Sequence, residues 1–364
     1  MSAADPHGLL KVHGLDLSYF TGKLEAYLRA KGLPYQLVEM DSRAFRRCAR
    51  QTGVAQMPQV ELPDGRWLTD STAIIEQFEQ EYPLPAIYPN DPALCFIADL
   101  LEDFGDEWLW RPAMYYRWAF AEDARQLGER LARGMLRDVP LPLAWRRALI
   151  TRRQRQLFLK GDGITPETAP VVEALYPKIL DALQIALADQ PFLLGQRPSQ
   201  ADMGFFGSMF RHFYSDPTGA RIMRERAPRV RAWVERLWRL QPDAYRNEAP
   251  PGACPDGLQD LLHMACRDYL PYLQSNEQAV DRGAHQVCWT HAGVTFRTPA
   301  SPYQRWCWQR LRTRFQQLAE GERARVADWL DPAALQALQR GVPEGWTDAL
   351  PERTRGAVLN QRWR

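Results

Sequence analysis

Apolar and polar residues alternate with two different periods in the first 85 residues of the chain. Stretches with a period of two predict strands, and stretches with apolar positions three and four apart predict helices. The predicted strands are residues 9–13, 35–40, 59–62 and 66–68, and the predicted helices are residues 23–30, 42–50 and 72–80. Asp64-Gly65 supplies the turn chemistry of a hairpin between the last two strands. The order β-α-β-α-β-β-α is compatible with a small α/β domain.

The pattern changes after Pro92 and is helical almost throughout to about Arg239. The expected helices are residues 93–120, interrupted at Pro112, and then 144–158, 169–188, one that starts after Ser199, and 228–240. Ser199 and Asp202 have the spacing of a capping box, which marks the start of a helix. This part of the chain therefore predicts an all-helical domain.

A proline-rich linker, residues 247–257, separates this helical part from an extension of about 110 residues. The extension is expected to hold helices at 258–273, 303–318 and 323–330, and a hairpin of 286–290 with 294–297 around His291-Ala292-Gly293. We divide the chain into an α/β domain (1–85), an all-helical domain (86–246) and a mostly helical extension with one hairpin (247–364).

The composition of the 364 residues narrows the class of protein. Hydrophobic residues make up 45% and charged residues 25% of the chain, as in an ordinary globular protein. The 46 basic and 44 acidic residues leave a net charge of +2, which is too balanced to predict a nucleic-acid partner. No apolar run reaches about 18 residues, so we expect no membrane-spanning segment. Residues 1–8 lack the basic start of a secretory leader.

Six cysteines are scattered along the chain without a Cys-x-x-Cys pair. This pattern argues against a disulfide scaffold and favours a reducing, cytoplasmic location. His263-x-x-Cys266 and His285-x-x-Cys288 supply two pairs of nitrogen and sulfur ligands, formally enough for zinc. One pair falls on a predicted helix and the other on a predicted strand, so we interpret all four as buried structural residues and expect no metal.

Ser18, Tyr19 and Thr21 stand at the turn before the first helix. Free N–H groups and the helix dipole stabilise an anion there, and a hydroxyl can donate to it. Lowering the pKa of a thiol by about two units takes roughly 2.7 kcal/mol, which a helix end and one hydroxyl can supply. The structural alternative is that Ser18 only caps the helix.

Two further segments of the first domain could bind a ligand. A cis bond between Met57 and Pro58, just before a predicted strand, would turn the Met57 backbone outward to pair with an extended peptide ligand. At the next helix start, the Ser71 hydroxyl suits a ligand carboxylate and Asp70 suits an ammonium group. Taken singly, a proline at a strand start and an acidic helix cap are also ordinary structural features.

In this order and spacing the three segments resemble the glutathione transferase superfamily. Residues 18–23 are similar to the active-site turn of that family, residues 56–60 to its cis-proline segment, and residues 70–74 to its acidic signature. In the helical half, residues 192–202 resemble its capping-box signature, and 227–233 a later helix. The resemblance covers roughly residues 9–242, about two thirds of the chain.

The resemblance implies a thioredoxin-like domain that binds glutathione, a helical domain that supplies the pocket for a small hydrophobic electrophile, and a homodimer. Carried over residue by residue, Ser18 would donate to the glutathione sulfur. Met57, with Pro58, would pair its backbone with the cysteinyl moiety. Asp70 and Ser71 would hold the γ-glutamyl end.

The chain departs from the family pattern at the turn itself. Tyr19 stands where many members have proline, and its hydroxyl could compete with Ser18 as the sulfur donor. Thr21 is expected among the glutathione-binding residues of the same turn. Because neither Ser18 nor Thr21 is a cysteine, thiol exchange by the protein is disfavoured. We expect a transferase that conjugates the glutathione thiolate to a hydrophobic electrophile. The alternatives are a catalytically weak or inactive scaffold whose extension binds protein partners, and a glutathione-dependent reductase or lyase.

Three clusters in the helical half allow two interpretations each. Aromatic residues after Ala93 could line the acceptor pocket or pack in the core; they are Phe104, Trp108, Trp110, Tyr115, Tyr116, Trp118 and Phe120. The acidic run from Asp99 to Glu107 could hold a metal, but a solvated face is the favoured interpretation. The arginines between 146 and 155 could bind phosphate, but they are interpreted as a solvated or dimer-facing surface.

Overall fold

One four-stranded sheet, in the order β2-β1-β3-β4, forms the centre of the first domain in this computed structural model, which describes residues 8–343, 346–348 and 350. The strands are β1 (Leu10–Gly14), β2 (Tyr35–Glu39), β3 (Gln59–Glu61) and β4 (Trp67–Thr69). β1 runs parallel to β2 and antiparallel to β3, and β4 is antiparallel to β3. This is the predicted α/β domain, with the predicted order of elements.

The helices of this domain begin and end at residues that suit their positions. They are α1 (Tyr19–Lys31), α2 (Ser42–Thr52) and α3 (Ser71–Glu81). Asp41 caps α2 by accepting a hydrogen bond from the Ala44 N–H at 2.8 Å. Gly32 ends α1 in the left-handed conformation, with φ 69°, which glycine adopts without steric cost. Ser18 and Asp70 cap the other two helices and belong to the candidate site.

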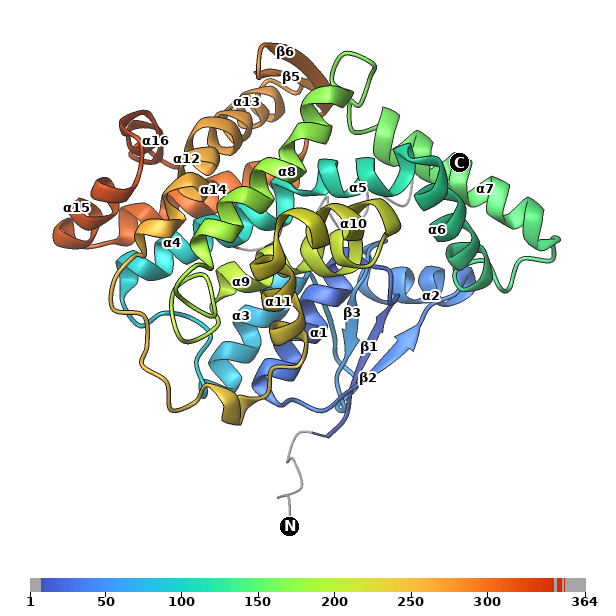
Figure 1. The fold of residues 1–364 in the computed structure, drawn as a ribbon, viewed down its shortest axis with the longest axis horizontal. Coiled ribbons are helices and arrows are strands. Elements are labelled where there is room, and N and C mark those ends of the chain that lie inside the picture. The colour runs from blue at the N-terminus through green and yellow to red at the C-terminus, as the bar shows by residue number, and fades with distance from the viewer. Residues whose placement is uncertain (1–7, 344–345, 349, 351–364) are drawn as a thin grey trace.

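The second domain is all-helical, as predicted (Figure 1). Its helices are α4 (Pro92–Asp103), α5 (Trp110–Ala119), α6 (Ala121–Arg133), α7 (Leu143–Arg155), α8 (Ala169–Ala186), α9 (Gln200–Ser208), α10 (Pro217–Arg226) and α11 (Pro228–Trp238). The predicted capping box is present at the start of α9. Its Asp202 carboxylate also accepts from the Trp233 indole N–H at 2.9 Å, so the cap ties α9 to α11.

The predicted interruption at Pro112 is wrong. The break lies upstream, where a π-helical segment, Phe104–Trp108, separates α4 from α5. Pro112 is the third residue of α5, within the first turn, where a backbone N–H has no partner inside the helix and its loss costs little. A π-helical segment adds a residue to the turn and shifts the helical register without any proline.

The extension follows the linker and confirms the predicted hairpin. It consists of α12 (Gln259–Met264), α13 (Leu270–Asp281), β5 (Gln286–His291), β6 (Val294–Pro299), α14 (Pro302–Gln317), α15 (Glu320–Trp329) and α16 (Pro332–Leu338). The helix expected at 258–273 continues to Asp281 through a π-helical segment, Ala265–Tyr269. Ala292 and Gly293 both have positive φ, as a tight two-residue hairpin turn requires.

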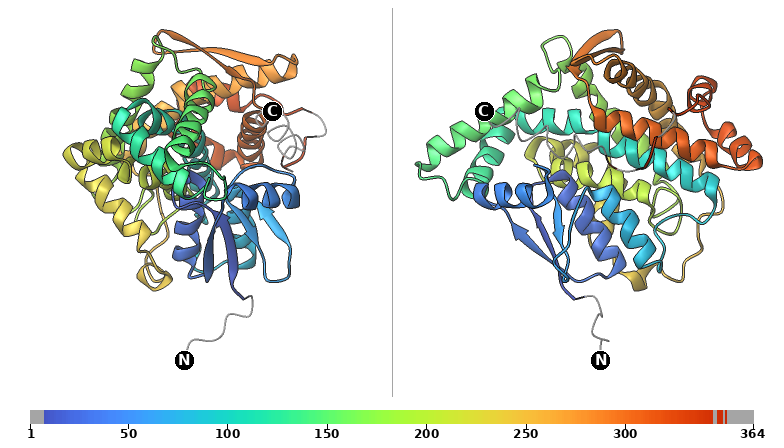
Figure 2. Two further views of the ribbon diagram at one scale, coloured as in Figure 1. Left: turned by 90° about the vertical axis from the view of Figure 1, so that its right-hand side faces the viewer. Right: turned by 180° about the vertical axis from the view of Figure 1, so that it is seen from behind.

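The extension packs on both preceding domains rather than standing apart. Figure 2 shows α14 running along α4 in the view from behind. The Arg314 guanidinium of α14 reaches Asp99 of α4 at 2.6 Å and Glu76 of α3 at 2.5 Å. Arg325 of α15 binds Asp91, the cap of α4, at 2.7 Å. One arginine thus joins the sheet domain, the helical domain and the extension.

The interpretation of the acidic run as a solvated face is wrong. Asp99, Glu102 and Asp106 are 4–6% exposed, because α4 and the π-helical segment point them at cations of other elements. Within the described residues, no helix combines the length and the apolarity needed to cross a membrane. Residues 1–7, which bear on the expected lack of a leader, lie outside the described residues, and the domain boundaries stay predictions.

Candidate functional site

The pairing of the strands brings the three predicted segments to one edge of the sheet. His13, near the end of β1, pairs with Gln59, which starts β3, and Gln59 pairs with Thr69, which ends β4. The turn at Ser18 follows β1, Met57-Pro58 precedes β3, and Asp70 follows β4. Each segment therefore leaves the sheet at the same edge, although 52 positions separate Ser18 from Asp70 in the sequence.

Ser18 is the N-cap of α1 and is half-buried. Its hydroxyl accepts from the Thr21 N–H at 3.4 Å, a long contact that leaves the hydroxyl hydrogen available for donation. The Gly22 N–H is already bonded to the Ser18 carbonyl at 3.0 Å. Ser18 therefore caps the helix, as the structural alternative expects. It also offers a hydroxyl hydrogen at the helix start, so the two interpretations are compatible.

The Tyr19 side chain points away from this edge. It is 2% exposed, and its hydroxyl donates to the Gly105 carbonyl at 2.5 Å, in the interface with the helical domain. Gly207 makes room for the ring, since a Cβ there would meet it at 2.8 Å. Burial, together with the charge of Asp106, raises the pKa of the hydroxyl well above its ordinary value. This geometry argues against Tyr19 as the sulfur donor.

Thr21 is fully buried beneath the turn. Its side chain packs against Gly14, where a Cβ would come within 2.5 Å of the Thr21 hydroxyl. The hydroxyl has no hydrogen-bond partner among the described residues. The third helical position faces the sheet here, so the expected contact of this side chain with glutathione is not available.

The peptide bond between Met57 and Pro58 is cis. Among the described residues, no group bonds to the Met57 N–H or C=O. The Gln59 side chain instead binds the carbonyls of Val54 and Gln56, at 2.9 and 3.1 Å, and holds the loop before the proline. The predicted cis bond is confirmed. The Met57 backbone is free of partners in the described chain, and its pairing with an extended peptide stays a prediction.

Asp70 caps α3 in a conformation that L-residues rarely adopt, with φ 74°. Its Oδ1 accepts from the backbone N–H groups of Thr72 and Ala73, at 3.1 and 3.2 Å. Within the described chain, neither Oδ2 nor the Ser71 hydroxyl has a hydrogen-bond partner. Strained backbone of this kind persists where its surroundings fix it, often at ligand sites. Asp70 and Ser71 therefore offer one free carboxylate oxygen and one hydroxyl beside a helix start.

One aromatic residue of α5 lies beside the turn. The Trp110 ring stacks on Phe20 with centroids 6.1 Å apart and meets Phe158 at 5.3 Å. Its indole N–H donates to Asp162 at 2.9 Å. All three rings are partly exposed, whereas Phe104, Trp108, Tyr116 and Trp118 of the predicted aromatic wall are core residues. Trp110 is the residue of that set which fits an acceptor-pocket wall.

The helix α14 of the extension supplies neighbours of Asp70 that the sequence did not suggest. Burial, and then the Asp70 charge, raise the pKa of the Tyr303 hydroxyl. Burial, and then the charges of Asp103, Glu107 and last Asp70, raise the pKa of the Cys307 thiol. Burial lowers the pKa of the Arg310 guanidinium to about 9, and the Asp70 charge acts in the opposite direction. Positions 303, 307 and 310 share one helical face. The spacing in the sequence shows this shared face, but it does not show that the face lies near Asp70.

A buried lysine lies behind the site. Lys23 of α1 has no exposed side-chain surface and binds Glu102 at 2.5 Å, Asp106, and the Thr72 hydroxyl at 2.9 Å. Burial alone lowers the pKa of Lys23, but the charges of Asp106 and Glu102 outweigh it and hold the pKa above its ordinary value. This cluster joins α1 and the start of α3 to the helical domain.

Two more carboxyls between the helical domain and the extension have raised pKa values. Burial raises the pKa of Asp103 to about 7, although the Tyr269 hydroxyl donates to it at 2.7 Å. Burial and the charge of Asp103 raise the pKa of Glu107 to about 8. For both carboxyls the pKa in the folded protein lies above the pKa in the unfolded chain. Both groups therefore stabilise the fold when they are protonated, and this contribution is lost as the pH rises.

Replacing Asp103 by asparagine should flatten the pH dependence of stability. The free energy of unfolding of the wild-type chain should fall as the pH rises from about 5 to 8, because the folded state holds protons there that the unfolded state has lost. Denaturant titrations across this range measure the slope. Asp64→Asn, at an exposed turn, should keep the wild-type slope. An unchanged slope in Asp103→Asn would contradict the assignment.

The paired histidines and cysteines of the extension are not the four buried residues expected. Cys266 is buried, but Cys288 and His285 are exposed, and His263 lies half-exposed near Asp331. All six cysteines are free thiols. Among the described residues, no three His, Cys, Asp or Glu side chains are grouped as a metal ion would need.

A thioredoxin-like sheet with a capping serine, a cis-proline and an acidic helix cap at one edge, joined to an all-helical domain, defines the glutathione-transferase type of architecture. Two family models match the chain: the N-terminal domain of glutathione S-transferase at residues 12–86, and its C-terminal domain at residues 144–236. The chain therefore belongs to the glutathione transferase superfamily through these two domains. A search of curated proteins finds no match.

Solved structures that are similar to the chain cover 63–68% of it. The β-etherase LigF from Sphingobium is 22% identical, with a TM-score of 0.45, over 63% of this chain and 94% of its own. A glutathione-transferase-like protein from Pseudomonas syringae is 20% identical, with a TM-score of 0.43, over 68% and 77%. A glutathione transferase from Methylobacterium radiotolerans, solved with glutathione sulfonate, is 22% identical, with a TM-score of 0.39, over 63% and 90%.

Proposed function

We propose that this protein is a glutathione-dependent transferase that conjugates the thiolate of glutathione to a small hydrophobic electrophile. The observation that carries the proposal is the convergence, at one sheet edge, of three groups without partners. They are the Ser18 hydroxyl hydrogen, the Met57 backbone and the second oxygen of Asp70. A donor, a peptide-pairing backbone and an anion suit a thiol, an extended peptide and an ammonium group respectively.

Ser18 would act on the sulfur. Glutathione supplies the nucleophilic thiol, and the protein has to favour its ionised form near neutral pH. The Ser18 hydroxyl donates a hydrogen bond to the sulfur at the start of α1, where the helix dipole also favours negative charge. Both effects lower the pKa of a thiol held there.

The other groups would orient the tripeptide. The Met57 N–H and C=O pair with its central residue, while Asp70 Oδ2 and the Ser71 hydroxyl take its amino-terminal end. Tyr303 and Arg310 of α14 lie on the Asp70 side, so in this proposal the extension closes that end. Fixing the thiol in this way removes much of the entropy cost of meeting a second reactant.

The acceptor would lie against Trp110 and Phe20. Their stacked, partly exposed rings form an apolar wall next to the Ser18 turn, and the bond from Trp110 to Asp162 fixes its plane. Apolar walls with few polar groups are typical of pockets for small hydrophobic molecules. The homodimer and the cytoplasmic location stay predictions.

Calorimetric titration of the full chain with glutathione tests the proposal. We expect saturable binding at one site per chain, weakened at least fivefold in Asp70→Asn, because that change removes the charge that faces the ammonium group. Asp64→Asn, which removes an exposed carboxylate elsewhere, should bind as the wild type does. No heat of binding at millimolar glutathione would leave the alternative of a scaffold without turnover.

A further inference from the structure

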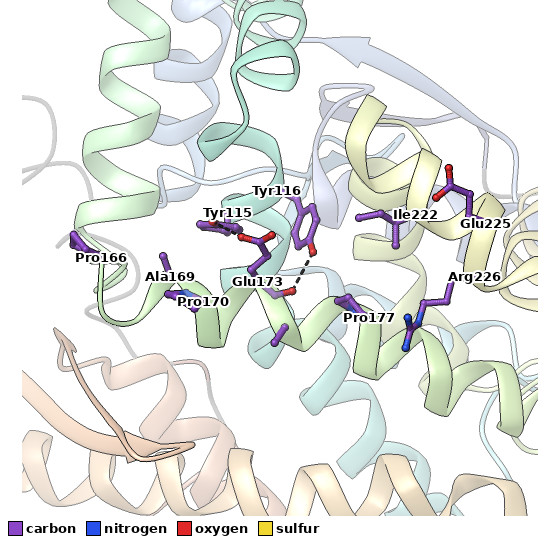
Figure 3. A pocket seen from close by; sticks show the side chains of 11 residues that line it. Tyr115, Tyr116, Pro166, Ala169, Pro170, Glu173, Pro177, Ile222, Glu225 and Arg226 are labelled. Carbon is purple, nitrogen blue, oxygen red and sulfur yellow. Dashed lines mark hydrogen bonds between the residues drawn. The ribbon is translucent and has the colours of Figure 1, made fainter.

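A cavity of the described chain lies away from the candidate site. It is a surface groove of about 890 Å³ between α5, the first half of α8 and α10 (Figure 3). Its lining residues are Tyr115, Tyr116, Pro166, Ala169, Pro170, Glu173, Ala174, Pro177, Ile222, Glu225 and Arg226. None of them belongs to the candidate site, and the proposed transferase reaction leaves the groove without a role.

The walls of the groove suit a ligand with an apolar body. Tyr115 and Tyr116 meet edge to face with centroids 5.8 Å apart, and both rings pack against Phe120. Figure 3 shows the two rings, which come from α5, beside Glu173 of α8, with Pro170 and Pro177 of the same helix on either side of Glu173. Proline and tyrosine rings present rigid apolar surface that loses little entropy on binding.

The charges of the groove leave one carboxylate without a cation. Arg226 is paired with Asp181 at 2.5 Å, and Glu225 with Arg221 at 3.0 Å. Glu173 forms no ion pair with any described residue. A half-buried carboxylate without a partner cation gives the floor of the groove a net negative charge.

Hydrogen bonds hold Glu173 in place. The Tyr115 hydroxyl donates to its Oε2 at 2.7 Å, and the Tyr116 hydroxyl donates to its backbone carbonyl at 3.0 Å. Burial, and then the bond to Glu173, raise the pKa of Tyr115 to about 12, so this hydroxyl remains a donor at neutral pH. Oε1 of Glu173 has no hydrogen-bond partner in the described chain and is available to a ligand.

We propose that this groove is a second binding site, for an organic cation with an apolar body, such as a hydrophobic amine or quaternary ammonium compound. The ammonium group would lie against Glu173 and the partly exposed ring of Tyr115, since aromatic rings attract cations through their electron-rich faces. The apolar part would lie along the prolines and Ile222. A volume of about 890 Å³ is within the range of sites for drug-sized ligands.

Calorimetric titration of the full chain with benzyltrimethylammonium tests this site. We expect saturable binding to the wild type and little binding of benzoate, which has the same ring and the opposite charge. Glu173→Gln keeps the size of the side chain and the bond from Tyr115 but removes the charge, so affinity for the cation should fall at least fivefold. Glu225→Gln, which changes an already paired carboxylate of the same groove, should stay within twofold of the wild type.

Two outcomes would overturn the proposal: equal loss of affinity in both glutamine variants, or binding of benzoate as tight as that of the cation. Tyr115→Leu, which removes one ring and leaves the carboxylate, should weaken the cation at least threefold, and an unchanged affinity would contradict the role of the ring. Glutathione at saturating concentration should leave the affinity for the cation unchanged. The groove is thus tested independently of the transferase proposal.

Discussion

Replacing Ser18 by alanine should raise the pKa of the thiol of bound glutathione and lower kcat/KM about tenfold to hundredfold. A hydrogen bond to a charged acceptor is worth about 1.5–3 kcal/mol, and each 1.36 kcal/mol is a factor of ten in rate. The thiolate absorbance of the complex, followed against pH, measures the first effect. Steady-state rates with an aromatic electrophile measure the second.

Two matched variants separate the donor from the helix cap. Ser18→Thr keeps a hydroxyl and should retain most of the rate. Tyr19→Phe should leave the pKa of the thiol unchanged, because the Tyr19 hydroxyl binds Gly105 inside the interface, but it should lower the free energy of unfolding by about 1–3 kcal/mol. If Ser18→Ala leaves the pKa of the thiol at its wild-type value, the assignment of the donor fails.

Replacing Lys23 by methionine should have the largest effect on stability. Methionine fills a similar volume but leaves Glu102 and Asp106 buried without their cation. Breaking a buried ion pair from one side costs about 3–5 kcal/mol. Denaturant titration at neutral pH measures the loss. Arg133→Met, which breaks an exposed pair with Glu129 on α6, should change the free energy of unfolding little.

The pH dependence of the Lys23 variant has a definite sign. The raised pKa of Lys23 means that its contribution is fully present below about pH 10.5 and is lost only as the pH rises through the folded value. The two carboxyls left behind are more stable when protonated, so the deficit of Lys23→Met should shrink as the pH falls. A deficit below about 1 kcal/mol at neutral pH would show that the cluster does not stabilise the fold.

Short sequence patterns predicted correctly those features of the fold that depend on neighbouring residues alone. The hairpin at Asp64-Gly65, the capping box at Ser199 and the end of α1 at Gly32 depend on a few neighbouring residues, and the structure confirms all three. The break after α4 was misplaced because an inserted π-helical turn leaves no composition signal, whereas Pro112 seemed to offer one.

Contacts between distant segments decided the features that the sequence did not predict. Tyr19 and Lys23 lie one turn apart on α1, but their partners come from the π-helical segment and α4, 79 to 86 positions further along the chain. The acidic run looked solvated because its cations, Lys23 and Arg314, belong to other elements. The second groove joins three helices, and no single stretch of sequence encodes it.

The two ion pairs of Arg314 restrict the motion of the sheet domain relative to the helical domain. Glu76 belongs to the sheet domain and Asp99 to the helical domain. The guanidinium of Arg314, from the extension, forms an ion pair with each of them. A hinge motion that moves one domain away from the other has to break at least one of these ion pairs, which leaves a carboxylate without the Arg314 cation. Binding of a ligand at the sheet edge is therefore expected to depend on small local rearrangements of side chains rather than on a wide opening of the domains.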